Sequence, residues 1–150
     1  MIKIICGVDP GKHGAIALLD AHKHIEVYAM PKEESDLNFL FGDFNPYNFI
    51  CYIESIHSSP QMGVASAFTF GYGYGLLMGM LHAHGIPYIK VQPQKWQRGL
   101  SCLTKGDKKV TLKKAREIFP DNKEINIDNA DSVLIAEYGR RHQILLEAQK

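Results

Sequence analysis

The chain has 150 residues, of which 45% are hydrophobic and 22% charged, with a formal net charge of +1. This length suits one domain, residues 1–150, with a sizeable core, and the composition is not that of a disordered segment. Three cysteines show no metal-ligand spacing, and an odd number in apolar surroundings favours a reducing compartment. No basic stretch followed by a long apolar run opens the chain, so we expect a cytoplasmic protein.

The first half of the chain predicts four strands and a helix. Residues 2–9, 15–19 and 24–30 have the pattern of strands, and tight turns between them indicate an antiparallel meander. A short helix is predicted over residues 33–44. The strand at 49–54 is apolar on both faces, which is typical of the middle of a covered sheet.

The second half alternates helices with one more strand. A helix is predicted from Ser59-Pro60 to about His84, then a strand over 86–91 and a helical turn over 93–99. Helices over 107–119 and from Asp128 to about 147 complete the chain. This order predicts an α/β fold with a five-stranded mixed sheet, three antiparallel strands and then parallel strands, flanked by helices.

One long segment has no Asp, Glu, Lys or Arg, between Ser55 and Ile89. Residues 62–81 are long enough to cross a bilayer, so a small membrane protein is one alternative. We expect instead a buried helix, because the segment is rich in Gly, Ser, Thr and Tyr and has no Lys or Arg close to its ends. A stripe of small residues, including Gly71, Gly75 and Gly79, would lie close to the sheet or to another helix. The space beside it would be filled by Phe68, Phe70, Leu77, Met80 and Leu81.

Four acidic residues stand where predicted elements begin or end. Asp9 and Glu54 each close a buried strand, and Asp128 and Asp131 open the last helix at positions i and i+3. Each has an ordinary structural explanation, as a turn residue, a strand end or a helix cap. Together they predict a magnesium site, because Mg²⁺ prefers oxygen ligands and relieves the repulsion between carboxylates held close together. Paired ions of this kind assist phosphodiester cleavage.

Positive charge gathers between residues 105 and 116, opposed only by Asp107. Such a cluster suits phosphate binding, although a solvated lysine-rich helix face explains it equally well by itself. The predicted phosphate contacts are Lys105, Lys108, Lys109, Lys113 and Arg116.

Four motifs occur in an order that resembles the RuvC family of Holliday junction resolvases. They are Gly7-Val8-Asp9-Pro10-Gly11, Tyr52-Ile53-Glu54, Gly71-Tyr72-Gly73-Tyr74-Gly75 and Asp128-Asn129-Ala130-Asp131. The resemblance extends from Ile4 to about Tyr138. It implies an RNase H-like fold and a homodimer. It also implies an endonuclease that uses two Mg²⁺ ions per site, and Mn²⁺ is expected to be able to replace Mg²⁺. Its substrate would be the four-way DNA junction of recombination and repair, cut to leave a 5′-phosphate.

The resemblance also assigns residues. It implies catalytic and metal-binding roles for the four acidic residues, and junction contacts above all for Lys108 and Lys109. His57 stands where many bacterial members have a phenylalanine that wedges against DNA bases, so it joins the DNA-binding candidates. Tyr72 and Tyr74 also depart from the usual polar and basic residues. These departures imply a divergent member from a bacterium or from a virus- or phage-infected cell.

Other functions remain open from the sequence. A broader endonuclease would cut flaps and forks as well as junctions, and a ribonuclease would cut RNA–DNA hybrids. A non-catalytic junction-binding protein would have no use for four carboxylates, which weaken phosphate binding. His13 and His57 are candidates for proton transfer, although a single histidine is more often structural.

Overall fold

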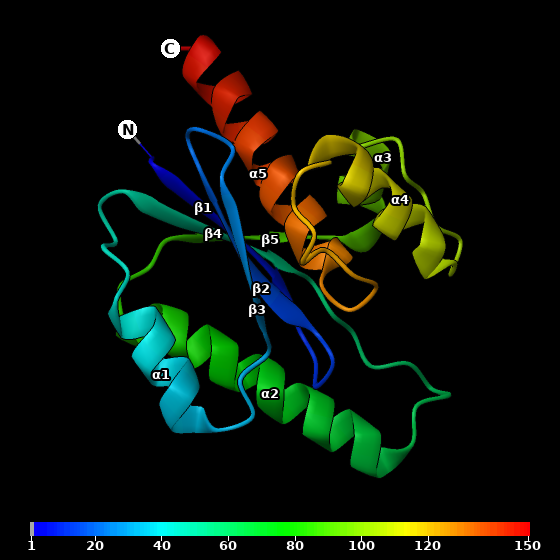
Figure 1. The fold of residues 1–150 in the computed structure, drawn as a ribbon. Helices are drawn as coiled ribbons and strands as arrows, with labels where there is room; N and C mark the ends of the chain where they lie inside the picture. Colours follow the sequence, from blue (N-terminus) through cyan, green and yellow to red (C-terminus); the bar gives the residue numbers. More distant parts are fainter. Residues whose placement is uncertain (1) are drawn as a thin grey trace.

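The computed structural model describes residues 2–150 (Figure 1). Five strands form one sheet in the order β3-β2-β1-β4-β5. They are β1 (Ile4–Asp9), β2 (Ala15–Asp20), β3 (Ile25–Ala29), β4 (Phe49–Glu54) and β5 (Tyr88–Val91). The first three strands are antiparallel neighbours, whereas β4 runs parallel to both β1 and β5. The predicted mixed sheet, with the fourth strand inside it, is confirmed.

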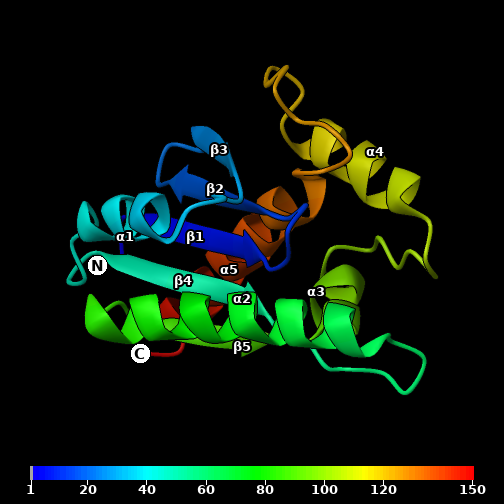
Figure 2. The ribbon, with the colours of Figure 1, turned by 90° about the horizontal axis from the view of Figure 1, so that it is seen from below.

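Helices cover both faces of the sheet (Figures 1 and 2). On one face lie α1 (Glu34–Gly42) and α2 (Val64–Ala83), which contact each other. The other face is covered by α5 (Ala130–Ala148), and α3 (Pro93–Gly99) and α4 (Lys108–Ile118) pack against α5. Strand side chains alternate between the two layers, so Ile5 and Tyr52 belong to the core under α5, and Val8 and Ile53 to the core under α1 and α2.

The backbone of α5 approaches β1 very closely at Gly7. A Cβ atom on Gly7 would overlap backbone atoms of Ser132 and Ala136, and one on Gly139 would overlap the side chains of Tyr52 and Ile5. Glycine at these two places lets helix and strand backbones meet. This contact fixes where the first turn of α5 lies relative to the end of β1.

The predicted burial of α2 is wrong in its main feature. Only Leu77 and Leu81 of this helix are buried, and Phe68 remains 75% exposed. Gly71 and Gly75, like Gly79, have open space where a side chain would stand. The helix contacts the sheet through one narrow apolar edge, and its small-residue stripe faces away from the sheet.

The ends of α2 also differ from the prediction. The helix begins at Val64, capped by Gly63, because the segment after Ser59-Pro60 forms a turn in which the Met62 N–H donates to the Ser59 carbonyl. Among residues 2–150, α2 is the helix whose length and composition would let it span a membrane, which is weak evidence by itself. In the structure it packs on the sheet through Leu77 and Leu81.

Candidate active site

Two of the predicted carboxylates end adjacent parallel strands. The register of β1 against β4 pairs Val8 with Ile53, so the next residues, Asp9 and Glu54, complete the two strands side by side. Asp9 and Glu54 come two residues after Gly7 and Tyr52, which face α5, so strand alternation directs them to the same face. The carboxyl ends of the two strands therefore present both side chains on the α5 side of one sheet edge.

A third carboxylate comes from the first turn of α5. The close packing of Ser132 on Gly7 brings the neighbouring Asp131 to the end of β1. Within the described residues, the Oδ1 atom of Asp131 is buried and has no hydrogen-bond partner. A buried carboxylate oxygen without a donor is unfavourable, which suits a position where a cation binds.

The pKa values show that these groups repel one another. Burial, followed by the charges of Glu54 and Asp131, raises the pKa of Asp9 to about 7, against an opposing effect of Lys108. Burial also raises the pKa of Glu54, and Asp131 adds to this rise, whereas a hydrogen bond from Trp96 and the charge of Lys108 oppose it. Three acidic groups and one lysine thus act on one another at the same edge.

Asp128 has different surroundings from the other three predicted carboxylates. The predicted helix start at Asp128 is displaced, because α5 begins at Ala130. The side chain of Asn126 accepts from the backbone N–H groups of Asp128 and Asn129, forming an Asx turn in place of helix. Asp128 is exposed, and it is not among the groups that shift the pKa of Asp9 or Glu54.

The start of α4 places Lys108 near the carboxylates. The side chain of Asp107 caps this helix by accepting from the Lys109 N–H at 2.9 Å, so Lys108 is its first residue. Lys105 lies exposed in the preceding loop. Beyond them, a shallow groove of about 400 Å³ is lined by Lys109, Leu112, Lys113, Arg116 and Glu117.

Two of the predicted phosphate contacts also have partners within the protein. The Arg116 guanidinium donates to the Ile125 carbonyl at 3.2 Å, and Lys113 lies 4.0 Å from Glu117. The two candidate histidines are both exposed, His13 in the turn after β1 and His57 in the segment after β4. The structure therefore leaves Lys108 as the basic residue whose charge acts on both Asp9 and Glu54.

The residue that sequence reasoning missed is Trp96. It is fully buried at the centre of α3, and its indole Nε1–H donates to Glu54 Oε2 at 2.7 Å. The residues are 42 positions apart, so no local pattern connects them. The one available signal was that the chain has a single tryptophan, placed shortly after the predicted fifth strand.

The donor set fits a hard divalent cation. Asp9, Glu54 and Asp131 supply carboxylate oxygens, and the unpartnered Oδ1 of Asp131 has no competing protein donor. Among residues 2–150, no three His, Cys, Asp or Glu side chains already enclose a position for an ion. The three carboxylates come from the ends of β1 and β4 and the first turn of α5, and oxygen donors of this type are those that Mg²⁺ prefers.

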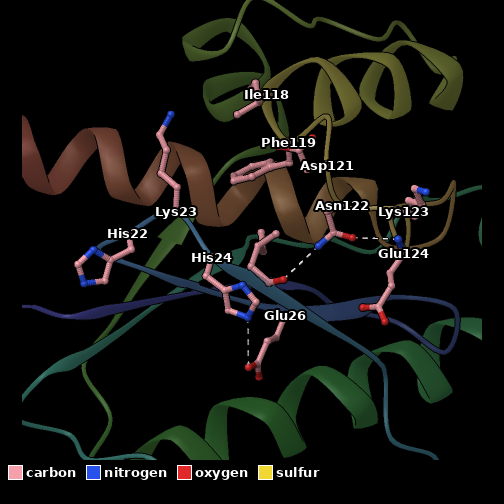
Figure 3. A pocket seen from close by; sticks show the side chains of 11 residues that line it. His22, Lys23, His24, Glu26, Ile118, Phe119, Asp121, Asn122, Lys123 and Glu124 are labelled. Atoms are coloured by element: carbon pink, nitrogen blue, oxygen red, sulfur yellow. Dashed lines mark hydrogen bonds and ion pairs between the residues drawn. The ribbon is translucent and has the colours of Figure 1, made fainter.

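A cavity of about 760 Å³ lies elsewhere (Figure 3). It is formed by the turn between β2 and β3 and by the loop after α4. Asn122 donates to the Ile25 carbonyl at 3.1 Å and so joins its two walls, and His24 faces Glu26 at 3.6 Å. Its lining mixes both signs of charge and includes no predicted site residue.

No protein-family model and no curated protein sequence matches the chain. Solved structures do match. The chain is similar to the structure of RuvC from Thermus thermophilus, with a TM-score of 0.63 and 15% identity over 93% of this chain and 96% of that one. It is equally similar to Thermus thermophilus RuvC in complex with Holliday junction substrate, with a TM-score of 0.63 and 17% identity over the same shares of the two chains. The fold is therefore RuvC-like and belongs to the RNase H-like class, as predicted.

Proposed function

We propose that this protein is a divalent-metal-dependent endonuclease that resolves four-way DNA junctions. The observation that carries the proposal is the meeting of Asp9, Glu54 and Asp131 at one sheet edge. One Asp131 oxygen there has no partner, and burial together with the charges of Glu54 and Asp131 raises the pKa of Asp9. The RuvC-like fold supports it, and one of the similar structures holds a Holliday junction.

In the proposed reaction, Asp9, Glu54 and Asp131 hold the metal, two Mg²⁺ ions per site with Mn²⁺ able to replace them. Bound there, the ions would activate the attacking water and neutralise charge on the departing 3′-oxygen, which leaves a 5′-phosphate on the other product. Lys108 contacts the scissile phosphate and offsets its charge. We choose this lysine because its positive charge lowers the pKa of both Asp9 and Glu54 and so lies close to the carboxylates. Asp128 is the least suited of the predicted ligands, since it is exposed and is not among the groups that raise the pKa of Asp9 or Glu54.

The basic groove of α4 provides the DNA contacts in this proposal. Lys109, Lys113 and Arg116 line one groove on the same helix that carries Lys108, so a strand bound there continues toward the carboxylates. Lys105, in the loop before α4, and His57, in the segment after β4, are both exposed and add contacts to the junction arms. Phosphate contacts of this kind position the DNA without reading its sequence.

We also propose that the working form is a homodimer. A four-way junction presents two equivalent strands, and each chain has one carboxylate cluster, so paired cuts require two copies. The exposed side of α2 is the face best suited to this contact. Val64 is 88% exposed, Phe68 75% and Tyr72 55%, and they repeat every four residues along the helix beside the open glycine stripe.

The test is cleavage of a mobile four-way junction, a flap, a fork and a linear duplex, with and without Mg²⁺, by wild type and Asp9→Asn. The expected result is paired, symmetric, Mg²⁺-dependent nicks with ligatable 5′-phosphate ends on the junction, absent in the variant. Equal cleavage of flaps and forks would widen the function to branched DNA in general. A junction that is bound but never cut, with Mg²⁺ or Mn²⁺, would leave the non-catalytic binding function in its place.

A further inference from the structure

A hydrogen bond between Trp96 and Glu54 joins the candidate site to the core. The indole Nε1 lies 2.7 Å from Glu54 Oε2, which is a short distance for an N–H donor and typical of a bond to a charged oxygen. Trp96 itself is 0% exposed. Its N–H is the only polar group of the side chain, and it points at the carboxylate.

The position of Trp96 is determined by elements on both sides of it. Val91 at the end of β5 pairs with Glu54 at the end of β4, and the Val91 carbonyl accepts from the Ser55 N–H at 2.8 Å. Pro93 then starts α3, and the indole ring packs into the core cluster under α5. The donor is therefore held by the same strand pair that carries its acceptor.

The two oxygens of Glu54 are not equivalent as a result. Oε2 accepts from the indole, and Oε1 has no hydrogen bond from the described residues. The bond also favours the charged form of the carboxylate, against the burial and the Asp131 charge that raise its pKa. A carboxylate that is fixed through one oxygen and has the other unoccupied is a suitable ligand for a hard cation.

We propose that Trp96 is a positioning residue that holds Glu54 Oε2 through its indole N–H and thereby presents Oε1 to a divalent cation. This inference rests on the proposed metal-dependent function, and it adds a residue and a readout to it. Because Trp96 is the only tryptophan in the chain, tryptophan fluorescence reports on the surroundings of this one indole, which include Glu54.

The first experiment titrates metal-free wild-type protein with Mg²⁺ and with Ca²⁺ while tryptophan emission is recorded. A saturable change in emission is expected, with the same midpoint as the heat of binding in calorimetry. Asp9→Asn, which leaves Trp96 and Glu54 intact, should abolish or strongly weaken both signals. Emission that stays constant while calorimetry shows cation binding would contradict the proposal.

The second experiment removes the N–H. Trp96→Phe keeps an aromatic ring in the core, and should weaken cation binding about tenfold or more, as losses of ligand-orienting partners do. Cleavage should then need correspondingly more Mg²⁺, with activity recovering at high Mg²⁺ and junction binding unchanged in Ca²⁺. Phe119→Leu is the matched control, because it perturbs the same core cluster without contacting Glu54.

If Trp96→Phe fails to fold, incorporation of 3-benzothienylalanine at position 96 provides the same test, since sulfur replaces only the N–H in a ring of equal shape. Wild-type cation affinity in either Trp96 variant would overturn the positioning role, as would an equal loss of cation affinity in Phe119→Leu. Neither result would contradict the proposed nuclease function. Absence of both cation binding and cleavage in wild type would instead overturn the proposed function.

Discussion

Asp128 and Asp131 are three residues apart, yet their surroundings differ. Asp131 has a buried, unpartnered oxygen, and its charge raises the pKa of Asp9, whereas Asp128 is exposed in the turn before α5. Asp131→Asn should therefore reduce junction cleavage by about a hundredfold to a thousandfold, by the scale of lost catalytic electrostatic groups. Asp128→Asn is the matched control and should stay within a fewfold of wild type. Single-turnover cleavage at saturating Mg²⁺ measures both, and equal losses would place Asp128 in the site as well.

Asp9 makes the stability of the metal-free protein depend on pH. The pKa of Asp9 is about 7 in the folded chain, against 3.8 for a free aspartate side chain, so between these pH values the folded state binds more protons than the unfolded state. The free energy of unfolding should then decrease as pH rises from about 4 to about 7. The difference of about three pKa units corresponds to on the order of 4 kcal/mol as an upper limit.

Urea denaturation in EDTA at pH 5 and pH 7.5 measures this dependence. Asp9→Asn should flatten it and be more stable than wild type at pH 7.5, because the repulsion with Glu54 and Asp131 is gone. Added Mg²⁺ should restore wild-type stability at the higher pH. A wild type that becomes more stable from pH 5 to 7.5 without metal would contradict the proposed environment of Asp9.

At the scale of elements, the contact between β1 and α5 depends on Gly7. A Cβ atom there would overlap backbone atoms of Ser132 and Ala136, which cannot move aside as a flexible side chain would. Gly7→Ala should lower the free energy of unfolding by about 3 kcal/mol and also displace Asp131 from Asp9. The control is Gly75→Ala in α2, where open space surrounds the new methyl group. That change should be neutral or stabilising by up to about 1 kcal/mol in denaturant unfolding.

The helix α4 divides its basic residues between two tasks. Lys108 acts on the carboxylates, whereas Lys109 lines the groove farther along the helix. Lys109→Ala should weaken junction binding and lower the slope of log affinity against log salt concentration by about one. Lys108→Ala should reduce the cleavage rate more than the affinity. Binding in Ca²⁺ at several salt concentrations, beside single-turnover cleavage, separates the two, and identical profiles would show that both serve binding alone.

At the scale of the whole molecule, the proposed homodimer forms through the exposed face of α2. The rings of Phe68 and Tyr72 stack with centroids 6.4 Å apart on a surface that the sheet does not cover. Phe68→Glu should shift the protein from dimer to monomer in sedimentation analysis and convert paired junction cuts into single nicks. Tyr47→Glu serves as the control, since Tyr47 is 91% exposed in a turn far from this stripe in sequence. A wild type that sediments as a monomer, both free and on the junction, would contradict the dimer.

The sequence predicted the five strands and their mixed sheet, and it placed two candidate site residues, Asp9 and Glu54, at strand ends. Alternating and continuous apolar runs identify the strands, and β4 matches its predicted range Phe49–Glu54 because its apolar run ends in a glutamate. Asp9 and Glu54 follow from the same local logic, since parallel strands that end in carboxylates bring them to one edge. The predicted starts of α2 and α5 were wrong, because Ser59 and Asn126 form turns where the first helical turn was expected.

Other features follow from packing between segments far apart in the sequence. The burial of Asp131 beside the end of β1 depends on how closely α5 lies on Gly7, and these two elements are more than 120 positions apart. The bond from Trp96 to Glu54 and the open glycine stripe of α2 are likewise outcomes of packing. Hydrophobic patterning predicts which residues can be buried. Whether another element packs against them, and which one, depends on the whole fold.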